Sequence, residues 1–464
     1  MVSTPAVVIA APASGSGKTT VATGLIGALR RAGHRVAPFK VGPDFIDPGY
    51  HALAAGLPGR NLDPVLVGEH LIGPLFRHGA AESDIAVVEG VMGLFDGRIE
   101  QNAIGPARGS TAHVAGLLGA PVVLVVDARG QSQSVAALLH GFATFDRSVR
   151  VAGVILNRVG SARHEGVLRQ ACEQAGVPVL GAIPRDDELA VPSRHLGLVT
   201  AVEHGRLARQ AVDAMTELVA RHVDLAAVAG LAGTNVDCAP WDPAVVEPIG
   251  RGVVVALAAG KAFSFGYPEH SELLRATGAD VAGFDPMTDS LPTGSAALVL
   301  PGGFPEQYAS ELSTNDVVRQ QIRNLAEWGA PIHAECAGLT YLVDDLDGAP
   351  MCGALSGSAR FTERLVLGYR DAVATADSSV HLEGDRVTGH EFHRTAVTFD
   401  NQYPPAWAFR GSDGNTVADG AVHRGIHGGY LHTHAAAHPR AVTRFVASAI
   451  RASEPAPATS RLTR

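Results

Sequence analysis

The sequence predicts an α/β fold in two domains, and three observations support this prediction. Short β-branched runs alternate with helical stretches through the first half of the chain. A glycine-rich loop, Ser14–Thr20, directly follows the first apolar run. A second alternating pattern begins after residue 250 and contains a cysteine at a bend between a strand and a helix. Alternation of this kind is typical of parallel sheets covered by helices.

The ranges of the expected elements follow from this alternation. Strands are expected at 6–10, 36–39, 85–88, 122–126, 151–156 and 179–182, and helices at 19–32, 132–145 and 162–175. In the second half, strands are expected at 253–258 and 297–300, and helices at 270–277 and 316–328. An Ala-, Gly- and Pro-rich stretch separates the halves. We therefore predict a first domain at 1–223, a linker at 224–250, a second domain at 251–445 and a disordered tail at 446–464.

Composition excludes several classes of protein. Of the 464 residues, 46% are hydrophobic and 18% are charged, which suffices for buried cores, and the net charge is −9 without any long Lys/Arg run. This balance argues against a nucleic-acid partner. The four cysteines are scattered without a C-x-x-C pair, as in reduced, cytoplasmic proteins. Uncharged apolar runs stay below the ~18 residues of a membrane span, so no membrane partner is expected.

The loop after the first strand has the residues of a phosphate-binding loop. It lies between a predicted strand and a predicted helix, the context that such a loop requires. Backbone N–H groups would surround phosphates, Lys18 would reach the β/γ oxygens, and Thr19 would hold Mg²⁺. Pro12 stands where a strict loop has its first glycine. We predict an ATP site formed by Gly15, Ser16, Gly17, Lys18, Thr19 and Thr20.

Acidic residues follow two other predicted strands. Glu89 directly follows the strand expected at 85–88, and Asp96 lies in the loop after it. Asp44 and Asp47 lie in a proline-bounded loop after the second strand. Carboxyl ends of parallel strands gather at one edge of a sheet, where an α/β nucleotide site places its Mg²⁺ carboxylate.

Cys336 is the candidate nucleophile. It lies in Ala330–Tyr341, where an apolar run turns into a helix among small residues. Such a bend exposes a nucleophile above backbone N–H groups, as in the nucleophile elbow of hydrolases. A thiol needs a base within hydrogen-bonding reach. The segment 428–434 supplies His432, our choice, and His434 as the second option, and its alternation predicts a strand. Gly302, Gly303 and the Ala337 amide are candidate oxyanion donors.

Taken together, these stretches resemble the family of cobyrinic acid a,c-diamide synthases, including its hydrogenobyrinic acid form. The resemblance runs from the first strand to about Pro439. The motifs that carry it are 39–48, 88–97, 194–198, 301–306, 333–339 and 389–393. It implies a P-loop NTPase-type domain similar to dethiobiotin synthetase, followed by a class I glutamine amidotransferase-like α/β domain.

The resemblance also implies an activity and its residues. Members amidate the a and c carboxylates of a corrin-type acid through acyl phosphates, using ATP, Mg²⁺ and glutamine, in cobalamin biosynthesis. By position, Cys336 matches the nucleophile and His432 its histidine, and Asn157 resembles an adenine-contacting asparagine. Thr19, Asp44 and Glu89 are the expected metal ligands. The expected substrate-binding residues are Asp47, Asp96, Arg194 and His195.

One departure from the family pattern concerns the catalytic triad. Amidotransferases of this class often have a glutamate two residues after the catalytic histidine, and this chain has His434 there. The sequence therefore assigns no third triad member. The expected partners are L-glutamine and a corrin-type polycarboxylic acid. The expected assembly is a homodimer, although no residue pattern sets the oligomeric state.

Two alternatives stay open. The first is the same chemistry on another tetrapyrrole acid, as in cobyric acid synthase or nickel-sirohydrochlorin a,c-diamide synthase. The second is a partitioning-type P-loop ATPase switch. Such ATPases usually carry a second lysine early in the phosphate loop, where this chain has Ala13, and need no cysteine at a bend. The ligase is therefore the leading hypothesis.

Overall fold

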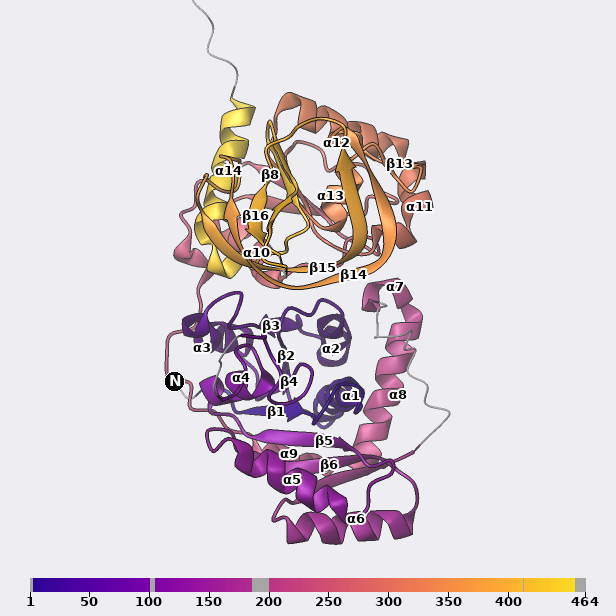
Figure 1. Cartoon of the computed structure of the whole chain (residues 1–464). Coiled ribbons are helices and arrows are strands. Elements are labelled where there is room, and N and C mark those ends of the chain that lie inside the picture. The colour runs from indigo at the N-terminus through magenta and orange to yellow at the C-terminus, as the bar shows by residue number, and fades with distance from the viewer. Residues whose placement is uncertain (1–2, 101–104, 186–199, 412, 455–464) are drawn as a thin grey trace, which may run out of the picture. The chain divides into compact units, whose positions relative to one another are not determined.

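The computed structural model describes residues 3–100, 105–185, 200–411 and 413–454. The chain forms two compact units, Met1–Asp242 and Pro243–Arg464 (Figure 1). Among the described residues, no helix combines the length and the apolar character that crossing a membrane requires.

Unit 1 contains a seven-stranded parallel sheet in the order β3-β2-β4-β1-β5-β6-β7. Its strands are β1 (Ala6–Ala10), β2 (Val36–Val41), β3 (Arg60–Leu62), β4 (Ile85–Glu89), β5 (Val122–Asp127), β6 (Val151–Val159) and β7 (Val179–Pro184). All six strands expected in this half are present, because β-branched runs buried on both faces read as continuous apolar segments. The short β3 was not predicted.

Helices pack on this sheet. They are α1 (Lys18–Arg31), α2 (Asp47–Ala55), α3 (Glu69–Gly79), α4 (Thr111–Leu118), α5 (Ser134–Phe145), α6 (Ala162–Gln174), α7 (Ala201–His204), α8 (Arg206–His222) and α9 (Leu225–Leu231). Helices α1, α2 and α8 lie together on one side, and α3 and α4 lie together on the other (Figure 1).

Unit 2 is built on a six-stranded sheet in the order β18-β19-β11-β10-β8-β9, in which only β18 runs antiparallel to its neighbour. Its strands are β8 (Val254–Ala258), β9 (Asp280–Phe284), β10 (Ser295–Leu300), β11 (Ile332–Glu335), β18 (Ala421–His423) and β19 (Ile426–Gly429). The helices are α10 (Pro268–Ala276), α11 (Ala309–Thr314), α12 (Asp316–Trp328), α13 (Ala337–Leu342) and α14 (Pro439–Ser453), with short 3₁₀ turns η1 (Pro243–Val245), η2 (Pro305–Gln307) and η3 (Ala435–Ala437).

A second sheet of unit 2 was not predicted. It contains β12 (Asp345–Leu346), β13 (Ala349–Pro350), β14 (Gly357–Ala374), β15 (Arg386–Phe399), β16 (Trp407–Arg410) and β17 (Thr416–Asp419). The long strands β14 and β15 pair antiparallel over most of their length. Many of their residues are only half-buried, so the sequence there lacks the apolar runs by which the other strands were found.

Two predicted boundaries differ from the structure. The segment predicted as a linker contains α9, and beyond it Gly233 and Ala6 exchange backbone hydrogen bonds, so its first part belongs to unit 1. The predicted tail begins inside α14, which runs to Ser453 and buries Val446 and Ala449 fully. The prediction of disorder from residue 446 is wrong for that helix, because its apolar residues recur at helical spacing and pack on the core. Residues 455–464 lie outside the described residues.

Candidate active sites

The predicted phosphate loop lies between β1 and α1, at the carboxyl edge of the parallel sheet. Gly15 and Gly17 have φ values of +80° and +93°, a conformation that side chains rarely adopt. Gly17 also lies against Asn157, because a Cβ there would be 2.2 Å from the Asn157 Nδ2. That amide donates a 2.9 Å hydrogen bond to the carbonyl of Ser16. The structure thus brings Asn157, from β6, to the phosphate loop, whereas its expected contact with adenine stays a prediction.

These contacts predict unequal effects of two similar substitutions. Both Gly17→Ala and Gly15→Ala place a residue with a Cβ in a left-handed backbone conformation, which costs ~1–2 kcal/mol. Only Gly17→Ala also displaces Asn157. We expect Gly17→Ala to weaken binding of a non-hydrolysable ATP analogue by at least tenfold more than Gly15→Ala does, a difference of about 1.4 kcal/mol. Isothermal titration calorimetry of both variants measures the difference, and equal losses of affinity would contradict it.

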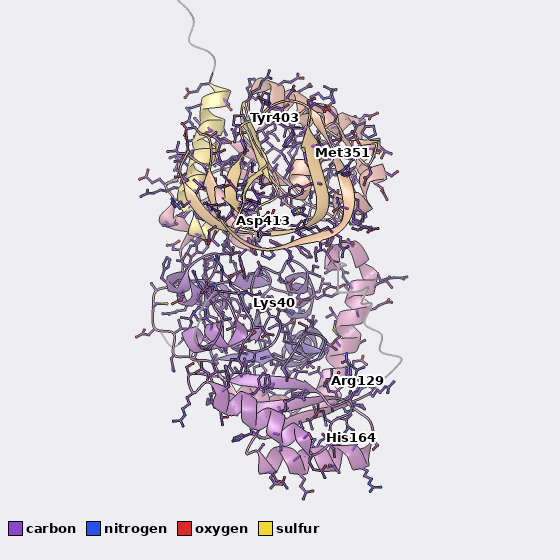
Figure 2. The ribbon with its side chains drawn as sticks, viewed as in Figure 1. Lys40, Arg129, His164, Met351, Tyr403 and Asp413 are labelled. Carbon is purple, nitrogen blue, oxygen red and sulfur yellow. The ribbon has the colours of Figure 1, made fainter. Side chains whose placement is uncertain are left out.

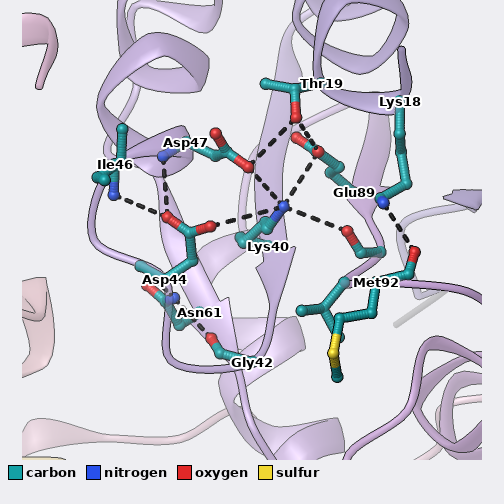
Figure 3. Close-up of polar contacts among 12 residues, drawn as sticks. Lys18, Thr19, Lys40, Gly42, Asp44, Ile46, Asp47, Asn61, Glu89 and Met92 are labelled. Carbon is teal, nitrogen blue, oxygen red and sulfur yellow. Dashed lines mark hydrogen bonds and ion pairs between the residues drawn. The ribbon is translucent and has the colours of Figure 1, made fainter. Parts of the chain in front are cut away.

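Lys40 lies at the centre of a buried charged cluster beside the loop (Figure 3). Its Nζ is 2.6 Å from Asp47 Oδ2, 3.0 Å from Glu89 Oε1 and 3.8 Å from Asp44 Oδ2. Its side chain is 4% exposed, whereas that of Arg129, two residues after β5, is 58% exposed. Figure 2 labels both residues. Burial alone would lower the pKa of Lys40, but Asp47, Glu89 and Asp44 outweigh it and raise that pKa. Lys40 is therefore a permanent cation in this cluster.

The hydroxyl of Thr19 joins the cluster. It donates to Glu89 Oε1 at 2.6 Å and lies 3.3 Å from Asp47 Oδ2 (Figure 3). Glu89 Oε2 is 2.6 Å from His51 Nε2, and both side chains are fully buried. Burial works against ionisation of Glu89, but Lys40 and His51 outweigh it and hold its pKa below the usual range. Burial and the neighbouring Asp44 raise the pKa of Asp47 to about 7, although Lys40 opposes this.

This donor set fits Mg²⁺, which prefers oxygen ligands and is usually bound by one or two carboxylates together with substrate phosphates. Thr19, Glu89 and Asp44 supply such oxygens. Within the described ranges, no three His, Cys, Asp or Glu side chains form a metal-binding group of their own.

The other predicted residues of unit 1 lie around this cluster. Lys18 Nζ donates to the carbonyl of Met92 at 2.9 Å, and burial lowers its pKa. Asp96 is exposed in the same loop, where it accepts a hydrogen bond from the Gly93 N–H at 3.0 Å. Thr20 is half-buried in the first turn of α1. The predicted Arg194 and His195 lie outside the described residues.

Cys336 occupies the predicted bend between β11 and α13, and this prediction is confirmed. Its φ is +50°, the strained conformation of a nucleophile elbow. Gly338 permits the bend, because a Cβ there would lie 2.2 Å from the carbonyl oxygen of Leu300. Burial raises the pKa of the Cys336 thiol, and the carboxylate of Glu306 adds to this, while backbone hydrogen bonds from Gly303 and Ala337 oppose it. Two of the three candidate oxyanion donors thus lie at the sulfur.

His432 lies in the same site. It is fully buried, and burial lowers its pKa to about 3, so its imidazole is neutral and able to accept a proton. Gly302, the third candidate donor, lies against its ring, because a Cβ there would be 2.2 Å from the His432 Cε1. The strand predicted at 428–434 ends at Gly429, and beyond it His432 exchanges two 2.9 Å backbone hydrogen bonds with His390.

Sequence reasoning missed two residues of the charged cluster. Lys40 is a charged residue inside an otherwise apolar strand, and that position was a usable signal. His51 lies on α2, which starts within the segment read as a loop, and its contact with Glu89 depends on the tertiary fold.

Comparison with known proteins agrees with this arrangement. Residues 7–199 match the CobQ/CobB/MinD/ParA nucleotide binding domain, and residues 254–440 match the CobB/CobQ-like glutamine amidotransferase domain.

Similar proteins match over nearly their full length. Hydrogenobyrinate a,c-diamide synthase of Mycobacterium tuberculosis is 70% identical, covering 96% of this chain and 98% of the relative. The protein of the same name from Streptomyces coelicolor is 52% identical, covering 95% and 97%. Cobyrinate a,c-diamide synthase of Syntrophotalea carbinolica is 41% identical, covering 96% and 98%. The chain therefore belongs to the family of a,c-diamide synthases, amide-forming ligases that carry a nucleotide-binding domain and a glutamine amidotransferase domain.

Proposed function

We propose that this protein amidates the a and c carboxylates of hydrogenobyrinic acid, using ATP and glutamine, in cobalamin biosynthesis. The observation that carries the proposal is the presence, in one chain, of two sites with complementary chemistry. One is the phosphate loop with its Thr19–Glu89–Lys40 cluster, and the other is the strained Cys336 with a neutral histidine. The first suits activation of a carboxylate, and the second suits release of ammonia from glutamine.

The first half-reaction is phosphoryl transfer. A carboxylate oxygen of the macrocycle attacks the γ-phosphorus of ATP, the bond to the β,γ-bridging oxygen breaks, and an acyl phosphate and ADP form. The loop N–H groups and Lys18 would hold the phosphates, and Lys40 would offset developing negative charge, which their positions beside the loop support. Thr19, Glu89 and Asp44 would hold Mg²⁺, which neutralises phosphate charge when bound. Asp47 and Asp96 are proposed to contact the substrate.

The second half-reaction releases ammonia. The thiol of Cys336 gives its proton to His432 and attacks the side-chain carbonyl of glutamine. The N–H groups of Gly303 and Ala337 would stabilise the resulting oxyanion. The amide C–N bond breaks, the nitrogen leaves as ammonia with a proton from His432, and water hydrolyses the thioester to glutamate. Ammonia then attacks the acyl phosphate, and phosphate leaves as the amide forms.

The relatives support hydrogenobyrinic acid as the substrate. Relatives named for hydrogenobyrinate are 70% and 52% identical to this chain, whereas one named for cobyrinate is 41% identical. Cobyrinic acid, which has the same carboxylates, is the second candidate.

Mass spectrometry of the reaction products tests the proposal. The enzyme is incubated with ATP, Mg²⁺, glutamine and either hydrogenobyrinic or cobyrinic acid, with single omissions of ATP and of glutamine. We expect two amidations of hydrogenobyrinic acid, each lost in either omission. Absence of amidation of both acids, with glutamate still released from glutamine, would contradict the proposed substrate but leave the glutaminase site in place.

A further inference from the structure

His434 stands where related amidotransferases often carry the glutamate of their triad, and its contacts point to a different role. Its Nδ1 accepts a 3.3 Å hydrogen bond from the Ala436 N–H at the start of η3. Its Nε2 lies 3.8 Å from Glu269 Oε2 on α10, and its ring stacks on Tyr267 with centroids 4.3 Å apart. The His434 side chain is thus held among structural contacts.

Glu335, the residue just before the nucleophile, brings a carboxylate to the catalytic histidine instead. Its Oε1 accepts hydrogen bonds from the backbone N–H and the hydroxyl of Thr433, at 3.0 and 2.9 Å. Its Oε2 lies 3.8 Å from Nδ1 of His432. One oxygen is therefore anchored by the neighbour of His432, and the other faces the imidazole.

We propose that Glu335 is the positioning residue of the glutaminase site, taking the part of the missing triad glutamate. A carboxylate facing Nδ1 keeps the proton on that nitrogen, so Nε2 is left to accept the proton of Cys336, and it stabilises the imidazolium that forms. The distance of 3.8 Å exceeds that of a hydrogen bond, but catalytic hydrogen bonds are often long without substrate and shorten in the complex. The inference rests on the proposed glutaminase role of Cys336 and His432.

The charges around Glu335 predict a pH dependence. On its own strand, His333 Nε2 lies 3.7 Å from Oε1, and His270, His381 and His438 line the same small cavity. Burial lowers the pKa values of these four histidines, so at neutral pH they add no positive charge. Burial raises the pKa of Glu335 to about 7, against the opposing hydrogen bonds from Thr433. The charged form is present above that pH and is lost as pH falls, and support for the imidazolium is lost with it.

Glu335→Gln is the sharpest test. An amide can still accept from Thr433 through its oxygen, but it presents an N–H to Nδ1 and carries no charge, which favours the wrong tautomer of His432. We expect kcat/KM for glutamate release to fall by about 10²-fold or more, while ammonia-dependent amidation persists. The charge of Glu335 by itself raises the pKa of the Cys336 thiol, so its loss alone would speed alkylation by iodoacetamide. If Glu335 acts through His432, alkylation, followed by peptide mass spectrometry, should instead slow by about tenfold at neutral pH, equal to about one pKa unit of the thiol. The acid limb near pH 7 should disappear from its pH profile.

Asp419→Asn is the matched control. Asp419 is also a buried carboxyl, and it accepts hydrogen bonds from the N–H groups of Tyr430 and Leu431, which directly precede His432. Its substitution should lower stability without changing the pH profile of Cys336 alkylation. If Glu335→Gln does not fold, Thr433→Val serves instead. It removes one donor to Oε1 and so raises the pKa of Glu335 further, which should move the acid limb to higher pH and slow alkylation at neutral pH by a smaller amount.

Two results would overturn the proposal. One is an unchanged alkylation profile in Glu335→Gln, and the other is the same change in Asp419→Asn. Alkylation needs no macrocycle, so it tests Glu335 even where amidation of the proposed substrate fails. Absence of glutamate release by the unaltered enzyme would count against the proposed glutaminase function instead.

Discussion

Lys18→Ala abolishes amidation whether glutamine or free ammonia supplies the nitrogen: this is the expected result for the phosphate loop. Activation of the carboxylate precedes attack by ammonia, so both nitrogen sources depend on the same phosphoryl transfer. Lys18 extends from the first turn of α1, and its Nζ donates to Met92 in the loop after β4. Removing a cation that stabilises a transferring phosphoryl group costs on the order of 10³–10⁵-fold in kcat, as for an arginine finger. Amide formation followed by mass spectrometry, with each nitrogen source in turn, measures the loss.

Two controls separate this effect from a loss of folding. Arg31→Ala removes a cation from the other end of α1, where Arg31 forms an exposed ion pair with Asp213, so it should leave activity nearly unchanged. Glutamate release in Lys18→Ala should persist, since the thiol site lies in the other unit. Ammonia-supported amidation at the normal rate in Lys18→Ala would remove the phosphate loop from the mechanism.

The fold of unit 1 could be predicted because local patterns determine much of it. Strands such as β1 and β5 are short apolar runs, and the phosphate loop marks the turn between β1 and α1. The same reasoning failed for β14 and β15, whose half-buried residues depend on pairing between distant segments. It also read the start of α2 as loop, although Pro48 in the first turn of a helix is a usual start signal.

The residues of the two sites likewise divide into those that the sequence predicts and those that it does not. Thr19 could be found because it belongs to the phosphate-loop motif, Glu89 because it lies at the carboxyl end of a strand, and Cys336 because small residues surround a bend. Lys40 contacts Glu89, 49 residues away, and Glu335 contacts Thr433, 98 residues away. Sequence spacing carries no information on such contacts, which arise from the order of strands in each sheet.

Cys336→Ala should have the opposite selectivity from Lys18→Ala. Glutamine-dependent amidation is expected to fall by about 10³-fold or more, since the covalent step is lost, whereas ammonia-dependent amidation is retained. The bend itself should persist, because the thiol is small and its neighbours Gly338 and Gly303 still leave the backbone room.

Cys352→Ala is the matched control, since Cys352 is equally buried in the same unit and its substitution should leave both reactions intact. Equal loss with both nitrogen sources in Cys336→Ala would show that the cysteine is not confined to glutamine hydrolysis. The two variants therefore test whether the two half-reactions take place at separate sites, because activation should fail only in Lys18→Ala and ammonia release only in Cys336→Ala.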